Sequence, residues 1–126
     1  ELTTEISPIE ARLERFVDLS RDFLGSNVVN ERKSEKLDMV LVYCEVETND
    51  TDCRGNEPIY VGNDLVGLTT SGTWSHTAGK SIAFAYVSPE LESSGSVFEI
   101  EIMNERCRAT VLKDAVVDPL NEKIRK

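Results

Sequence analysis

Histidine is almost absent from this chain of 126 residues, and basic residues are outnumbered by acidic ones. His76 is the only histidine, which excludes metal sites built from several histidines and any proton relay between two of them. Asp and Glu total 23 against 14 Lys and Arg, for a net charge of −9. Nucleic acids and anionic membranes bind basic surfaces, so neither is expected as a partner.

Cysteine is also scarce, and its spacing indicates no site. Cys44, Cys53 and Cys107 form no C-x-x-C pair, so no zinc or other metal site is expected. Three thiols without secretory features favour a reduced compartment, and we predict a cytoplasmic protein. The sequence has no apolar run long enough to span a membrane and no signal core after Glu1. We therefore expect a piece of a longer protein.

The middle of the chain is a β-rich stretch interrupted by turn residues. Pro58–Val61 and Leu65–Thr69 flank a Gly-Asn-Asp triplet, whose residues tolerate the positive φ of a tight reversal. Thr70-Ser71-Gly72 predicts a second turn. The strand expected at 81–88 is apolar at nearly every position, so we expect both of its faces to be covered.

Further strands are predicted on either side of this stretch. Apolar and alternating patterns indicate strands at 37–47, 97–103 and 107–113, and the acidic residues 48–57 are expected to form an exposed loop. Short strands separated by turns are typical of a closed sheet. We predict a mainly β fold, a small antiparallel β-barrel of about six strands preceded by one or two short helices.

Two helices are expected before the first strand. Ser7 can cap a helix whose Glu10 closes a capping box, and an apolar stripe continues to about Asp18. A second helix is predicted from Asp22 to about Arg32. Four of its apolar residues are expected to face inward: Phe23, Leu24, Val28 and Val29.

Several of these segments resemble a known family. Gly67-Leu68-Thr69-Thr70-Ser71-Gly72, Trp74-Ser75-His76 and Gly79–Val87 (GKSIAFAYV) resemble the C-terminal β-barrel domain of the aminomethyltransferase superfamily. This superfamily includes the glycine-cleavage T-protein and the tails of dimethylglycine and sarcosine dehydrogenases. The resemblance runs from about Ser7 to Arg125, and His76 and the Asp118-Pro119 tail look more like the dehydrogenase branch. It implies a crossover segment at 1–35, from a missing N-terminal folate-binding lobe, and a barrel domain at 36–126.

The resemblance implies an enzyme as the parent protein. That parent would be a tetrahydrofolate-dependent aminomethyltransferase, or a dimethylglycine or sarcosine dehydrogenase-type enzyme with FAD on an upstream domain. It would act on a small methylated amine or glycine derivative and deliver one carbon to tetrahydrofolate. The barrel would pack on the N-terminal lobe and cap the folate site. The family's catalytic aspartate belongs to that lobe, so the fragment alone is expected to contain no catalytic residue and to be inactive.

Three residues are expected to bind the cofactor in the parent. Arg125 matches by order a late arginine that meets the glutamate tail of folate in the family. Trp74 and His76 lie where a loop could touch a ligand, although a hydrogen bond from His76 that fixes the loop is the favoured alternative.

Two substitutions leave a second interpretation open. Arg12 and Glu14 stand where the family has glycines, and bulky residues are not expected to follow a backbone that needs glycine. Either this segment is helical here, or the folate pocket is altered. The alternative is a non-catalytic structural or interaction barrel in a divergent paralogue that no longer binds folate. A relative in iron–sulfur or tRNA-modification work is disfavoured because its K-G-C-x-x-G-Q-E signature is absent.

Overall fold

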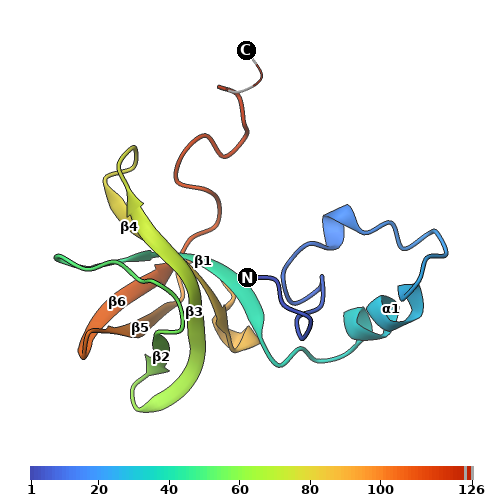
Figure 1. The fold of residues 1–126 in the computed structure, drawn as a ribbon, viewed down its shortest axis with the longest axis horizontal. Helices are drawn as coiled ribbons and strands as arrows, with labels where there is room; N and C mark the ends of the chain where they lie inside the picture. Colours follow the sequence, from blue (N-terminus) through green and yellow to red (C-terminus); the bar gives the residue numbers. More distant parts are fainter. Residues whose placement is uncertain (124, 126) are drawn as a thin grey trace.

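Six antiparallel strands close into a barrel in the order β1-β4-β3-β2-β5-β6 (Figure 1). The computed structural model describes residues 1–123 and 125, so Ile124 of the predicted tail motif and Lys126 lie outside the described residues. The strands are β1 (Val40–Val46), β2 (Pro58–Val61), β3 (Asp64–Ser75), β4 (Lys80–Val87), β5 (Val97–Ile102) and β6 (Glu105–Val111). The predicted small antiparallel barrel is confirmed.

The barrel interior is filled by side chains at alternate strand positions. In β1 the buried residues are the four at positions 40, 42, 44 and 46, and in β5 they are Phe98, Ile100 and Ile102. Burying a side chain of this size contributes about 1.5–3 kcal/mol relative to leaving it in water. The alternation predicted for 97–103 is therefore confirmed. β6 begins two residues earlier than expected, because Met103 and Asn104 both adopt positive φ and form a two-residue hairpin turn.

The turn predicted at Thr70-Ser71-Gly72 is wrong, because β3 continues through it to Ser75. The register with β4 shifts between Thr69 and Ser71, which marks a bulge in β3. A Cβ atom built on Gly72 would lie 2.6 Å from the Cβ of Cys53. Glycine at this position therefore leaves room for the segment around Cys53, which lies against β3. The chain reverses only after Ser75, whose carbonyl accepts a hydrogen bond of 2.8 Å from the amide of Gly79.

The segment 48–57 is not the exposed loop expected from its polar composition. Cys53 is only 1% exposed and belongs to the core, and the hydroxyl of Ser81 donates a hydrogen bond of 2.6 Å to Asp52. Glu57 and Thr69 join the end of the segment to β3. The backbone amide of Glu57 donates to the hydroxyl of Thr69 (2.9 Å), and that hydroxyl donates to the carboxylate of Glu57.

The helix predicted from Ser7 to Asp18 is replaced by a single capped turn. The capping box is present, since the amide of Ser7 donates to Glu10 (2.8 Å) and the amide of Glu10 donates to Ser7 (3.3 Å). The turn ends at Arg12, whose φ is 56°. The amide of Arg12 donates to Ile9 (3.0 Å) and that of Leu13 to Pro8 (2.8 Å), the pattern of a Schellman motif. The expectation that a bulky residue could not follow a glycine-type backbone is wrong at Arg12. A short 3-10 turn, Glu14–Phe16, follows.

The second helix, α1 (Ser26–Ser34), is shorter than predicted and buries little. It begins after Gly25, which adopts a φ of 90°, rather than at Asp22. Leu24 is fully exposed, Val28 is largely so, and Phe23 is 38% exposed, so three of the four residues expected to face inward do not. Figure 1 shows α1 set apart from the barrel, which explains why its apolar side chains are not packed in the barrel core. A last 3-10 turn, Pro89–Leu91, connects β4 to β5.

Candidate functional site

A cleft of about 620 Å³ lies between the crossover segment (residues 1–35) and the outer face of the barrel. The crossover segment is held beside this cleft by the carbonyl of Glu10, which accepts a hydrogen bond of 2.9 Å from the amide of Leu41 at the start of β1. Ile9, Glu10 and Ala11 are all buried there. The cleft is lined by residues of the crossover segment, of β1 and β4, and of the chain around 92–94 and 111–113.

The rim of the cleft is basic, although the chain as a whole is acidic. Arg12, Arg15 and Lys113 line it, against a single acidic residue, Glu92. Arg12 forms an ion pair with Glu92, with 2.5 Å between Nη2 and Oε2. Within residues 1–123 and 125, Arg15 and Lys113 form no ion pair. Two cations are therefore available to an anion in the cleft.

The floor of the cleft carries two aromatic rings. Tyr43 of β1 and Phe84 of β4 are paired in the sheet, and their ring centroids lie 5.0 Å apart with the planes tilted by 36°. Phe84 is 39% exposed, so the expectation that both faces of this strand would be covered is wrong. Burial raises the pKa of Tyr43, so the phenol adds no negative charge at neutral pH.

Glu10, at the edge of the site, is a buried carboxylate held by the backbone. Burial alone would raise its pKa, but hydrogen bonds from the amide and hydroxyl of Ser7 and the charge of Arg32 together hold the pKa below its usual value. The ionised side chain thus maintains the capped turn that precedes Arg12.

The three residues expected to bind a cofactor do not meet in this chain. Trp74 lies near the end of β3 and is 43% exposed, and His76 follows in the exposed turn to β4. Arg125 is exposed on the C-terminal tail, which leads away from the barrel (Figure 1). No hydrogen bond of the His76 side chain is found among the described residues, so the proposed fixing of the loop by His76 stays a prediction. None of the three lines the basic cleft.

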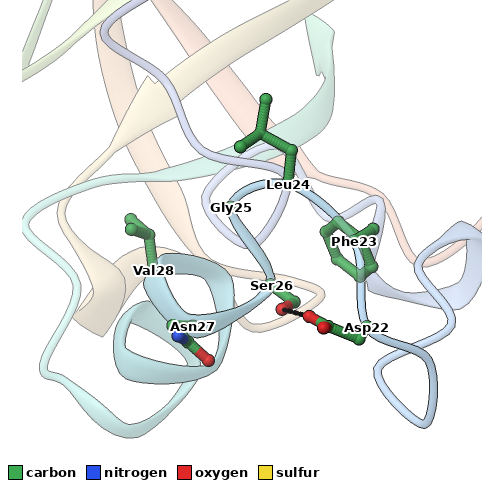
Figure 2. A pocket seen from close by; sticks show the side chains of 7 residues that line it. All are labelled: Asp22, Phe23, Leu24, Gly25, Ser26, Asn27 and Val28. Carbon is green, nitrogen blue, oxygen red and sulfur yellow. Dashed lines mark hydrogen bonds between the residues drawn. The ribbon is translucent and has the colours of Figure 1, made fainter.

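A second hollow, also of about 620 Å³, is formed by residues 22–28 (Figure 2). Within it, the hydroxyl of Ser26 donates a hydrogen bond to the carboxylate of Asp22 (3.2 Å), and the amide of Ser26 donates to the carbonyl of Phe23 (3.0 Å). Figure 2 shows Leu24 pointing away from Ser26 and from α1. The hollow is open and holds no group of titratable side chains beyond Asp22, so it offers surface for contact rather than chemistry.

The cleft brings cationic and aromatic side chains together, an arrangement that can bind an anion. Among the residues that the structure describes, no group of three or more His, Cys, Asp or Glu side chains is placed to hold a metal ion. Over the same residues, no helix has the length and apolar character needed to cross a membrane. Sequence reasoning missed the cleft. Its available signals were the outward position of Tyr43 in an alternating strand and the closeness of Arg12 and Arg15 in the sequence.

Comparison with known proteins matches residues 40–118 to the family described as the glycine cleavage T-protein C-terminal barrel domain. The chain is 37% identical over 130 residues to mitochondrial dimethylglycine dehydrogenase of Mus musculus, covering 100% of this chain and 15% of that protein. It is 38% identical over 115 residues to an aminomethyltransferase of Synechococcus elongatus, covering 90% of this chain and 31% of that protein.

The fold has a counterpart among crystal structures. The glycine cleavage system aminomethyltransferase T from Bartonella henselae matches with a TM-score of 0.81 and 19% sequence identity, over 90% of this chain and 32% of that one. At this identity the likeness concerns the fold alone. The chain spans less than a third of the length of each of these three proteins.

Proposed function

Because the chain belongs to the glycine cleavage T-protein C-terminal barrel family, we propose that it is the C-terminal barrel of a longer tetrahydrofolate-dependent enzyme. That parent is an aminomethyltransferase or an FAD-linked dimethylglycine or sarcosine dehydrogenase-type enzyme. Its reaction takes a small methylated amine or glycine derivative and delivers one carbon to tetrahydrofolate. The match to dimethylglycine dehydrogenase extends over the whole chain, whereas that to aminomethyltransferase covers 90%, which supports the dehydrogenase branch.

The barrel's part in that reaction is to pack on an N-terminal folate-binding lobe and cap the folate site. The observation that carries this proposal is the attachment of the crossover segment to the barrel. Arg12 adopts the left-handed backbone conformation and forms an ion pair with Glu92. The carbonyl of Glu10 accepts a hydrogen bond from the amide of Leu41. A segment fixed in this way sets the direction from which a preceding lobe meets the barrel.

Three exposed side chains of this chain are proposed to contact folate in the parent. The guanidinium of Arg125 would pair with a carboxylate of the glutamate tail. The indole of Trp74 would offer a face for stacking, and His76 in the adjacent turn would offer a hydrogen bond. All three are accessible in the described chain, as such contacts require. Tetrahydrofolate, when bound, accepts the one-carbon unit. FAD has no matching residues here and is assigned to an upstream domain.

The alternative function is a non-catalytic barrel for packing or subunit contact in a paralogue that no longer binds folate. This alternative was suggested by Arg12 and Glu14, which stand where the family has glycines. Arg12 follows the left-handed backbone that favours glycine, and Glu14 begins a 3-10 turn without positive φ. The crossover path is thus compatible with these side chains, which favours the folate-linked proposal.

The test is tetrahydrofolate binding, measured by calorimetry on the chain and on its full-length parent. We expect micromolar binding to the parent and no binding of that affinity to the chain alone, because the folate site is built mainly by the preceding lobe. Arg125→Gln in the parent should weaken binding by about tenfold, the loss of one charge-assisted hydrogen bond, whereas Lys123→Gln in the same tail should not. If neither protein binds, the folate proposal fails and the alternative holds.

We also propose a cytoplasmic location, supported by three cysteines that all remain free thiols. The names of three mammalian dimethylglycine dehydrogenases place those relatives in mitochondria. Fractionation of cells that express the parent decides between the two compartments.

A further inference from the structure

The basic cleft differs in charge from the rest of the molecule. The whole chain has a net charge of −9, yet the cleft is lined by three cationic residues and one anionic residue. Arg15 keeps its guanidinium carbon 4.6 Å from the ring centroid of Phe16, a contact that limits its freedom without neutralising its charge. A guanidinium that lines a groove is suited to binding an anion there, because it can donate charge-assisted hydrogen bonds.

Two aromatic rings line the same cleft as these cations. Tyr43 and Phe84 form one row across the outer face of the sheet, and Ser71 of β3 continues the row. A smaller hollow of about 160 Å³ is also lined by Tyr43, Phe84 and Ser71. The two rings therefore line both hollows and offer a partly exposed aromatic surface. Such a surface is suited to a planar ring, since offset and tilted aromatic contacts are favourable.

We infer that this cleft is a binding site for an anionic aromatic small molecule, with its ring on Tyr43 and Phe84 and its acid groups on Arg15 and Lys113. The site is separate from Trp74, His76 and Arg125, and it does not depend on the use of folate by the parent. Aryl carboxylates and nucleotide phosphates share the chemistry that these residues recognise. Glu92 repels an anionic ligand and is already paired with Arg12, so it lowers the affinity of the site for that ligand.

The test uses four probes on the 126-residue chain, with binding followed by the amide shifts in nuclear magnetic resonance spectra. p-Aminobenzoylglutamate carries a ring and two carboxylates, and AMP carries a ring system and a phosphate. p-Aminobenzamide supplies the ring alone and glutarate the carboxylates alone. We expect one of the first two probes to bind at least about tenfold more tightly than either half-probe, with shifts at Tyr43, Phe84 and Lys113. The tighter of the two identifies the acid group.

Variants separate the cleft from general charge effects. Arg15→Gln and Lys113→Gln should each weaken binding by about tenfold, and Glu92→Gln should strengthen it by releasing Arg12. Lys33→Gln removes the same charge from exposed helix α1 and should change nothing. Absence of saturable binding by both full probes overturns the inference. So does weakening by Lys33→Gln equal to that by Lys113→Gln, or a set of shifts outside the cleft. Tetrahydrofolate binding by the parent, measured separately, tests only the proposed function.

Discussion

Arg12 and Glu92 are 80 positions apart in the sequence, and their ion pair ties the crossover segment to the connection between β4 and β5. Arg12 makes this contact from a backbone with φ of 56°, a conformation that costs a residue other than glycine roughly 1–2 kcal/mol. The side chain and the backbone at this position therefore act in opposite directions on stability.

Substitutions at Arg12 separate these two contributions. Arg12→Ala loses the ion pair and keeps the backbone strain, so it should lower the free energy of unfolding by up to about 1 kcal/mol. Arg12→Gly loses the ion pair but relieves the strain, and should be about 1 kcal/mol more stable than Arg12→Ala. Urea denaturation measures both. Equal stability of the two variants would show that the left-handed backbone costs nothing here.

Gly72 should tolerate no side chain. A Cβ atom there would lie 2.6 Å from the Cβ and 2.9 Å from the carbonyl oxygen of Cys53, so Gly72→Ala should destabilise the barrel by about 1–3 kcal/mol through overpacking. Thr73→Ala, one residue along β3 at an exposed position, is the matched control and should have a small effect. A thermal unfolding midpoint of Gly72→Ala close to that of the unmodified chain would contradict the contact between Cys53 and β3.

Glu57 should make the stability of the barrel sensitive to acid. Burial would raise its pKa, but hydrogen bonds from Thr69 and from the amides of Arg54 and Gly55 hold the pKa below its ordinary value. A depressed folded pKa gives stability that is complete above the unfolded pKa of about 4.3 and is lost as pH falls through the folded value.

The unfolding free energy should therefore fall between about pH 5 and pH 3, and less steeply in Glu57→Gln. Glu99→Gln on the outer face of β5 controls for the removal of one acid. An identical pH slope in Glu57→Gln and in the unmodified chain would contradict the prediction.

The three thiols should differ in reactivity. Burial raises the pKa of both Cys44 and Cys53 to about 12, with the charge of Glu57 adding to the effect at Cys53. At pH 8 both should resist a disulfide reagent until the chain unfolds. Cys107 is less buried and should react first, and Cys107→Ser should remove that early reaction. Two or more fast thiols in the folded chain would contradict the burial of Cys44 and Cys53.

Local patterns in the sequence predicted the strands of the barrel but not the segments that pack against them. The alternation at 97–103 and the β-rich run at 58–61 depend only on neighbouring residues, so both strands could be predicted from the sequence. The same logic failed for Thr70-Ser71-Gly72, because small polar residues are typical both of turns and of strands approached closely by another segment. Only the position of Cys53, 19 residues earlier in the chain, distinguishes the two cases.

The crossover segment shows a second limit of sequence reasoning. The capping box at Ser7 and Glu10 was predicted and is present, yet the helix ends after one turn because Arg12 takes up a left-handed conformation. The basic cleft depends on tertiary neighbours of this kind. Arg15 and Lys113 lie 98 positions apart, and only the closure of the barrel brings both to the same groove.

The position of β1 in the barrel has a consequence for how the chain is made. Both neighbours of β1 in the sheet, β4 and β6, come later in the sequence. During synthesis this valine-rich strand leaves the ribosome with no partner. Its edge toward β4 stays open until residue 87 has followed, and its edge toward β6 until residue 111. Because closure depends on pairs distant in sequence, folding should be slow for the size of the chain, on the order of milliseconds to seconds. Until then β1 is the segment most exposed to aggregation with other nascent chains.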